Sequence, residues 1–250
     1  MLFNSFDRPS LRMQTSSNNF VVLDYKFGDV TGDGIPDHIY LTGYKRYGND
    51  SSFADQITLQ IQDGHTYQVV SLPLEVNGGY HPSLFPGDFN GDGVLDTLIS
   101  IDSGGSGGIG FFYIFSYRNK RAILLFDFEK FNNRYRYDVT YMDHYKVHVQ
   151  SKTLNKGYIL DISTREPEYL SALYNTAGKL IKPVKGDVLP LGGIFPIDIN
   201  RDSIYELLAV QRIIGIANAD TLGTVETTLK WDQSSFKTIH QVVTIQGTPL

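Results

Sequence analysis

The chain has 250 residues, of which 41% are hydrophobic and 20% are charged, and its formal net charge at pH 7 is −5. This balance excludes an intrinsically disordered chain, and the lack of a basic excess argues against a nucleic-acid-binding protein. Because the chain contains no cysteine, disulfides, thiolate metal sites and a cysteine nucleophile are excluded.

Short runs of β-branched and aromatic residues, bounded by Gly, Asn, Asp or Pro, dominate the sequence and predict strands. In chain order, the expected strands are Phe20–Phe27, His38–Leu41, Gln56–Ile61, Tyr67–Ser71, Thr97–Ile101, Gly110–Tyr117, Arg121–Phe128, Tyr135–Thr140, Lys146–Ser151, Tyr158–Ser163, Tyr205–Gln211, Thr224–Trp231 and Lys237–Ile245. Residues Glu168–Tyr174 could form one or two helical turns, and Pro183, Pro190 and Pro196 indicate a loop region. Many short strands with frequent turns predict an all-β sandwich, barrel or propeller.

The strand expected at Gly110–Tyr117 is apolar on both faces, because Phe112 and Ile114 alternate with aromatic residues of the other face. A strand with one face in water would alternate apolar with polar residues, so we expect this strand to be covered on both sides. No linker or break in composition divides the chain. We therefore expect residues 1–250 to form a single domain.

A nine-residue pattern occurs three times, at 29–37 (DVTGDGIPD), 88–96 (DFNGDGVLD) and 198–206 (DINRDSIYE). Each copy has an acid at its first, fifth and ninth positions and leads into an apolar strand. Calcium takes about six to eight oxygen ligands, and a tightly coiled loop directs alternate residues inward. The spacing predicts side-chain ligands at positions 1, 3, 5 and 9 and a carbonyl ligand at position 7. Gly34 and Gly93 would permit the left-handed turn that this coiling needs.

We expect two calcium sites and leave a third open. The predicted ligands of the first loop are the side chains of Asp29, Thr31, Asp33 and Asp37 and the Ile35 carbonyl; those of the second are Asp88, Asn90, Asp92, Asp96 and the Val94 carbonyl; those of the third are Asp198, Asn200, Asp202, Glu206 and the Ile204 carbonyl. The third loop has Arg201 and Ser203 in place of glycine, so we expect it to bind calcium most weakly. An EF-hand is excluded, because its position-12 acid would fall at Tyr40, Ile99 and Ala209, inside predicted strands.

These loops resemble the calcium loops of FG-GAP/VCBS-type repeats, which occur in integrin α-chain propellers and in bacterial surface proteins. The resemblance is specific at 29–37 and 88–96 and weaker at 198–206, and the Gly-Ala-Pro element of integrin-type repeats is absent. It implies a β-propeller whose blades each carry one loop between their first two strands. The second gap between loops is about twice the first, which predicts a degenerate copy near 138–146 and a propeller of four or five blades.

Other candidate sites are weaker. The glycine-rich stretch Ser103–Gly110 lacks the Lys-Ser/Thr ending of a phosphate loop and leads into a strand, so we expect a hairpin. The six histidines form no HExxH motif, and no Gly-x-Ser-x-Gly elbow is present. The many carboxylates leave a glycosidase or polysaccharide lyase open, and tyrosine-rich segments such as Tyr135–Asp138 could stack on sugars.

The sequence favours a calcium-binding module for binding or adhesion, without catalysis, on a cell or spore surface. Its expected partner is a protein or glycan ligand, with no nucleic acid and no membrane insertion, since no apolar run approaches the roughly 18 residues of a span. Residues 1–20 lack the basic start and apolar stretch of a signal peptide, so we expect none in this chain. A carbohydrate-active enzyme and a structural coat or envelope component are the alternatives, and the oligomeric state stays open.

Overall fold

The computed structural model describes residues 19–247, which form fifteen strands and two short helices. The strands are β1 (Phe20–Gly28), β2 (Asp37–Tyr44), β3 (Phe53–Gln62), β4 (Val69–Pro73), β5 (Gly79–Gly87), β6 (Asp96–Asp102), β7 (Gly110–Arg118), β8 (Arg121–Asp127), β9 (Tyr137–Met142), β10 (Lys146–Ser151), β11 (Lys156–Asp161), β12 (Lys185–Ile197), β13 (Glu206–Ile214), β14 (Thr221–Trp231) and β15 (Phe236–Thr244). The helices are α1 (Phe128–Arg134) and α2 (Pro167–Leu173). Neither helix has the length and apolar character that crossing a membrane would require.

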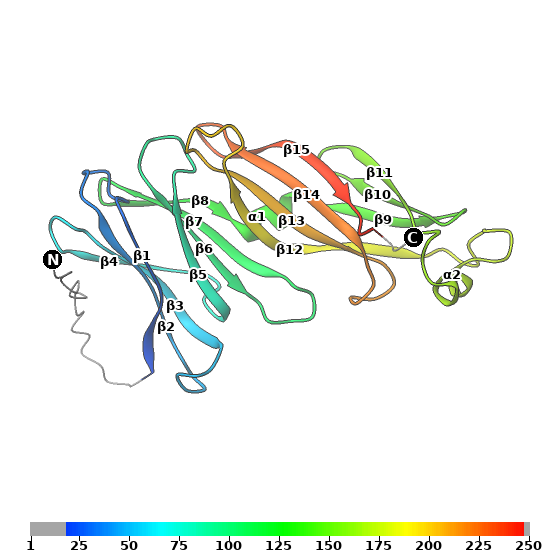
Figure 1. The fold of residues 1–250 in the computed structure, drawn as a ribbon, viewed down its shortest axis with the longest axis horizontal. Helices are drawn as coiled ribbons and strands as arrows, with labels where there is room; N and C mark the ends of the chain where they lie inside the picture. The colour runs from blue at the N-terminus through cyan, green and yellow to red at the C-terminus, as the bar shows by residue number, and fades with distance from the viewer. Residues whose placement is uncertain (1–18, 248–250) are drawn as a thin grey trace, which may run out of the picture.

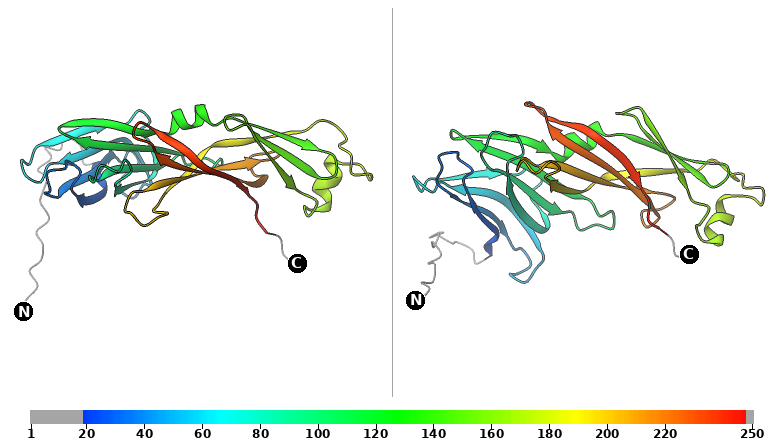
Figure 2. Two further views of the ribbon diagram at one scale, coloured as in Figure 1. Left: turned by 90° about the horizontal axis from the view of Figure 1, so that it is seen from above. Right: turned by 45° about the horizontal axis from the view of Figure 1, so that its top comes forward.

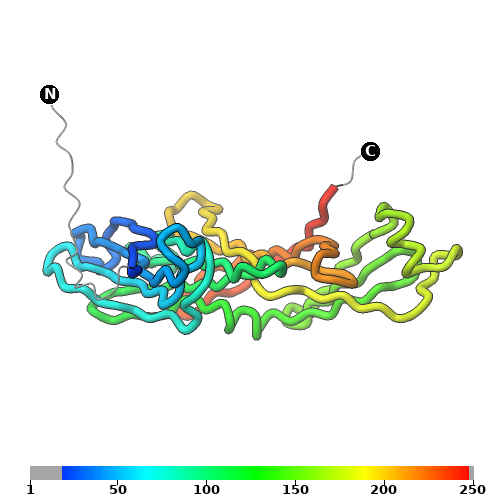
Figure 3. The backbone as a smooth tube through the Cα atoms, turned by 90° about the horizontal axis from the view of Figure 1, so that it is seen from below, coloured from blue at the N-terminus to red at the C-terminus, as the bar shows by residue number. Residues whose placement is uncertain are grey.

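The strands form two antiparallel sheets that follow one another along the long axis of the molecule (Figure 1). The 8-stranded sheet has the order β1-β2-β3-β5-β6-β7-β8, with β4 also paired to β3. The 7-stranded sheet has the order β11-β10-β9-β12-β13-β14-β15. The views from above and from below show the same elongated body, with β1–β4 at one end and β9–β11 with α2 at the other (Figures 2 and 3). The all-β prediction is therefore confirmed.

Three four-stranded meanders, β1–β4, β5–β8 and β12–β15, make up most of both sheets. In each meander the nine-residue motif joins the first strand to the second. The register is the same in all three, because the residue before the motif pairs with the acid at its ninth position. These pairs are Gly28 with Asp37, Gly87 with Asp96, and Ile197 with Glu206.

The predicted propeller is wrong. The meanders do not stand as separate blades around an axis. Strand β3 pairs with β5 (Phe53 with Tyr80), which joins the first two meanders into one sheet, and β9 pairs with β12 (Thr140 with Lys185), which joins β9–β11 to the third meander. The segment 138–146, expected to be a degenerate calcium loop, forms most of β9, a turn and the first residue of β10. The first spacing between motifs reflects the length of one meander, whereas the second also contains α1, β9–β11 and α2, and neither spacing indicates which strand edges pair.

Two strands were missed, and both contain proline. β5 includes Pro82 and Pro86, and β12 includes Pro190 and Pro196, which the sequence indicated as loop. Pro82 and Pro190 each lie where the register of the pairing shifts, so the ladder loses no hydrogen bond that a regular strand would need there.

The helices were partly predicted. The turn expected at Glu168–Tyr174 is confirmed as α2, which begins at Pro167. Helix α1 was missed, although Asp127 directly before it is a good N-cap residue, whose carboxylate accepts hydrogen bonds from the N–H groups of Glu129 and Lys130. An Asp before a seven-residue helix is too short a signal to separate from the surrounding strand pattern.

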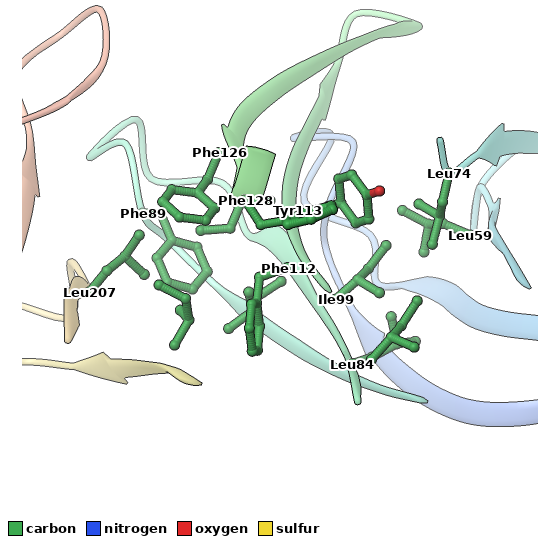
Figure 4. Packing of buried hydrophobic residues seen from close by; sticks show 14 of the residues in the cluster. Leu59, Leu74, Leu84, Phe89, Ile99, Phe112, Tyr113, Phe126, Phe128 and Leu207 are labelled. Atoms are coloured by element: carbon green, nitrogen blue, oxygen red, sulfur yellow. The ribbon is translucent and has the colours of Figure 1, made fainter. Parts of the chain in front are cut away.

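One buried cluster spans both sheets. It contains residues of β2, β3, β6 and β7 together with Leu191, Leu207 and Leu229 of the second sheet, and Figure 4 shows Leu207 at the edge of the packed aromatic groups that include Phe89. Strand β7 is buried or half-buried from Gly110 to Tyr117, which confirms that both its faces are covered. A second cluster packs β9–β11 and α2 against β13 and β14. The first cluster contains Val30 and Phe89 of the first two motif copies, and Tyr205 of the third copy packs against it.

Candidate metal-binding loops

The three motif copies, named here loop 1 (29–37), loop 2 (88–96) and loop 3 (198–206), lie in one row. The N–H of Leu95 in loop 2 donates to the carbonyl of Asp29 in loop 1 at 3.1 Å. The N–H of Tyr205 in loop 3 donates to the carbonyl of Asp88 in loop 2 at 2.8 Å. Both bonds join position 8 of one loop to position 1 of the loop before it. The same backbone hydrogen bond thus joins loop 2 to loop 1 and loop 3 to loop 2, so the three loops form a regular row.

Side chains repeat the same contact. A Cβ added to Gly32 would lie 2.9 Å from Cγ2 of Val94, and a Cβ added to Gly91 would lie 3.3 Å from Cδ1 of Ile204. The glycine at position 4 thus makes room for the position-7 side chain of the next loop. Ile35 is 39% exposed, whereas Val94 is 7% exposed, because no earlier loop in the described chain covers loop 1.

Loop 1 holds three carboxylates with backbone N–H groups. Asp29 accepts from Gly32 at 2.6 Å and from Gly34 at 2.8 Å, while Asp33 accepts from Ile35 at 2.8 Å. Asp37 is fully buried and accepts from the N–H groups of Val30 (2.8 Å), Thr31 (3.0 Å) and Gly64 (2.9 Å). The Oγ1 atom of Thr31 is buried without a hydrogen-bond partner in the described part of the chain. This loop combines a dense negative charge with an unsatisfied oxygen.

Loop 2 repeats this arrangement. Asp88 accepts from Gly91 (2.7 Å) and Gly93 (2.9 Å), and Asp92 accepts from Val94 (3.0 Å). Asp96 is fully buried and accepts from the N–H of Phe89 (3.0 Å) and the side-chain amide of Asn90 (3.3 Å). Burial raises the pKa of Asp96 to about 7, and the charges of Asp92 and Asp88 add to the effect. Among the described residues, Arg118 is a cationic neighbour of this loop, at 3.2 Å from Asp92.

Loop 3 keeps the backbone and changes the charges. Arg201 and Ser203 take positive φ values of 62° and 66°, close to those of the glycines that they replace. Asp198 accepts from the N–H groups of Asp202 (3.1 Å) and Ser203 (3.0 Å). Two further contacts close the loop: the N–H of Ile204 donates to Asp202 at 2.9 Å, and the side-chain amide of Asn200 donates to it at 2.7 Å.

The closing acid of loop 3 has a partner that the sequence did not indicate. Glu206 accepts from the N–H of Ile199 at 3.3 Å and from Nζ of Lys230 at 2.6 Å, and its side chain is only 3% exposed. The hydrogen bond from Lys230 to Glu206 raises the pKa of the lysine, and the charges of Asp202 and Asp198 contribute. Lys230 lies on β14, far from the motif in sequence, so only the strand register could have revealed it.

The predicted ligands thus come together within each loop, but not around one point. Among residues 19–247, no group of three or more His, Asp or Glu side chains is arranged to hold a metal ion. The acids of a loop each turn toward separate backbone N–H groups. The donors are nevertheless all oxygens, which suit calcium and not zinc, and the partnerless Thr31 Oγ1 lies at a predicted ligand position of loop 1.

Comparison with known proteins identifies relatives. The family model described as the YybI C-terminal domain matches residues 135–244, a range that begins after α1 and contains loop 3 and the whole 7-stranded sheet. The protein YybI of Bacillus subtilis (strain 168), whose name states no function, is 43% identical over 242 residues, covering 97% of this chain and 91% of the relative. No solved structure matches the chain.

These findings correct the family resemblance inferred from the loops. The family model that matches is not an FG-GAP or VCBS repeat, and the two-sheet architecture differs from a propeller. Short Asp-Gly loops arise on unrelated strand pairs wherever the chain must coil tightly, so a nine-residue motif is weak support for common ancestry. The extent of the match to YybI over nearly the full length of both proteins shows that this chain belongs to the YybI family.

Proposed function

We propose that this protein is a calcium-dependent binding module in which loop 1 and loop 2 each take one calcium ion. The observation that carries the proposal is the placing of Asp37 and Asp96, each fully buried beside two further acids of its own loop. A buried carboxylate is costly unless it is hydrogen-bonded and paired with positive charge. The N–H groups supply the hydrogen bonds, and a divalent cation would supply the charge.

The oxygens retain capacity for an ion. An ionised carboxylate offers about four lone-pair positions, whereas Asp29 and Asp33 accept two and one backbone hydrogen bonds respectively. Oδ2 of Asp33 lies 3.9 Å from Nδ1 of His65. The residues that would hold an ion in loop 1 are those predicted from the sequence, and the partnerless Oγ1 of Thr31 lies among them.

An exposed aromatic strip supports the binding role. On the edge strand β1, Tyr25 and Phe27 are 42% and 57% exposed, and both rings contact His38 of β2, at centroid distances of 5.9 Å and 5.2 Å. Exposed aromatic faces with polar edges favour contact with a protein or with sugar rings. A partner at a cell or spore surface, where calcium is abundant, would fit this strip.

Catalysis on carbohydrates is less well supported. Two hollows in the described chain are lined in part by Asp161 with Arg165 and by Asp63 with Lys120, so each contains a single acid. Glycoside hydrolysis ordinarily needs a pair of carboxyl groups about 5 to 9.5 Å apart. A structural coat component stays the alternative, because the edge strands β1, β8, β11 and β15 could support assembly.

The test is calorimetric titration of calcium into metal-free full-length protein. Two sites are expected, and Asp29→Asn and Asp88→Asn should each remove one. Asp138→Asn is the matched control, because Asp138 is an exposed acid paired with Lys152 at 2.8 Å, outside the loops. Absence of heat at millimolar calcium would contradict the proposal. A glycan and protein binding screen, run with and without calcium, then tests the binding role.

A further inference from the structure

The third strand of each meander passes beside the closing acid of its loop. In the three strand pairs, the residue after the motif lies opposite an equivalent residue of that strand: His38 opposite Gln62, Thr97 opposite Phe115, and Leu207 opposite Leu229. The next residue of the third strand is therefore equivalent in all three meanders. It is Asp63 in the first, Ser116 in the second and Lys230 in the third.

The residue at this position and the donors to the closing acid differ between the meanders. In the first meander the strand has ended before this position, which is occupied by Asp63, and the donor to Asp37 is the N–H of the following residue, Gly64, at 2.9 Å. In the second, the position is the buried Ser116, and Asp96 accepts hydrogen bonds from the N–H of Phe89 and the side-chain amide of Asn90. The hydrogen-bond donors to Asp37 and Asp96 are thus neutral groups, which supply no positive charge to the acid. In the third, Nζ of Lys230 lies 2.6 Å from Oε1 of Glu206.

The Lys230 ammonium contacts the carboxylate that a cation in loop 3 would also have to contact. A loop cation must contact the closing carboxylate, and Glu206, with a side chain only 3% exposed, has little freedom to turn away from Lys230. The same ammonium also feels the charges of Asp198 and Asp202. A divalent ion and a lysine ammonium at this place would repel one another, so one excludes the other.

We propose that Lys230 is the built-in cation of loop 3, supplying from the chain itself the positive charge that calcium supplies in loops 1 and 2. This inference rests on the proposed calcium binding of those two loops. It makes loop 3 stable at any calcium concentration. The 7-stranded sheet would then keep its structure without the ion, while the meanders β1–β4 and β5–β8 would respond to it.

The test is Lys230→Met in the full-length protein, since methionine keeps the apolar stem and removes the charge. Titration should rise from two calcium sites in the wild type to three in the variant, and a further Glu206→Gln substitution should remove the third. Lys237→Met is the matched control, because Lys237 is paired more loosely with Asp232 at 3.7 Å outside the loops, and it should keep two sites.

Thermal melting is the second measurement, and it shows whether a variant without the extra site has simply lost its fold. In chelator, Lys230→Met should melt several degrees below the wild type and recover when calcium is added, whereas Lys230→Arg should melt like the wild type and bind two ions. If Lys230→Met bound only two calcium ions and calcium did not restore its melting temperature, the role of Lys230 would be overturned and the proposed function would stand. The same conclusion would follow if the wild type bound calcium in loop 3. A wild type that binds no calcium would overturn both.

Discussion

Loops 1 and 2 on one side, and loop 3 on the other, share a backbone and differ in charge. Positions 4 and 6 have φ values of 80° and 84° in loop 1 and of 62° and 66° in loop 3, although loop 3 has no glycine there. The strand pairing at the ends of the loops and the backbone hydrogen bond between neighbouring loops are also the same along the row. The comparison teaches that the path of the loop is set by strand pairing and by its neighbours in the row, and not by glycine.

The pKa values of Asp96 in loop 2 and Asp202 in loop 3 are shifted in opposite directions. In loop 2, burial raises the pKa of Asp96 to about 7, so this acid resists ionisation near neutral pH. In loop 3, the backbone N–H of Ile204 lowers the pKa of Asp202, and the Lys230–Glu206 pair raises the pKa of the lysine. The closing acid of loop 3 thus has a charged partner, whereas burial disfavours the ionised form of Asp96 in loop 2.

The largest expected effect comes from removing a buried closing acid. Asp37→Ala leaves the N–H groups of Val30, Thr31 and Gly64 without their acceptor. Each buried unsatisfied donor costs about 1–3 kcal/mol, so we expect a loss of about 3–5 kcal/mol in the free energy of unfolding, measured by urea denaturation. Asp33→Ala is the control, since Asp33 is 35% exposed and accepts one backbone bond. Equal losses in the two variants would show that burial of the closing acid is unimportant.

A pH series separates loop 2 from loop 3 with the next largest effect. The pKa of Asp96 is about 7 in the folded protein against 3.8 ordinarily, so the native state binds more protons between about pH 4 and 7. Stability of metal-free protein should then fall by a few kcal/mol as pH rises through that window, and level off above it. With calcium the slope should flatten or reverse, because the ion requires the ionised acid.

The measurement is urea unfolding at a series of pH values with and without calcium. Asp96→Asn is the control, since it keeps the shape of the side chain and removes its titration. If the metal-free wild type and this variant gave parallel profiles, Asp96 would not be the group responsible.

The acids and their spacing could be predicted from the sequence, because the motif itself encodes positions 1, 5 and 9. What was missed depends on pairings between distant strands. The partner of Glu206 is a lysine on β14, and the contact between Gly32 and Val94 joins two loops far apart in the chain. The prediction of a propeller was wrong for the same reason, because neither strand's sequence alone indicates that Phe53 pairs with Tyr80.

The stacking of the row can be broken at one glycine. Gly32 and Gly34 have nearly equal φ values of 80° and 84°, so alanine at either position carries the left-handed cost of about 1–2 kcal/mol. Only Gly32→Ala crowds Val94, whereas nothing lies within 4 Å of the Gly34 position. Gly32→Ala should therefore lower the free energy of unfolding by about 1 kcal/mol more than Gly34→Ala. Val94→Ala should remove this difference, and its persistence would mean that the loops do not press on each other.

The smallest effect tests whether glycine decides which loop takes calcium. Arg201→Gly and Ser203→Gly relieve a left-handed conformation in loop 3, but glycine also gains freedom in the unfolded chain. The two terms nearly offset, so we expect each substitution to stabilise the protein by about 0.5 kcal/mol or less. The double variant would match the glycine pattern of loops 1 and 2 while keeping Lys230 beside Glu206. Calorimetry should still count two calcium sites, because the ammonium remains in place. A third site in this variant would show that the glycines, and not Lys230, keep calcium out of loop 3.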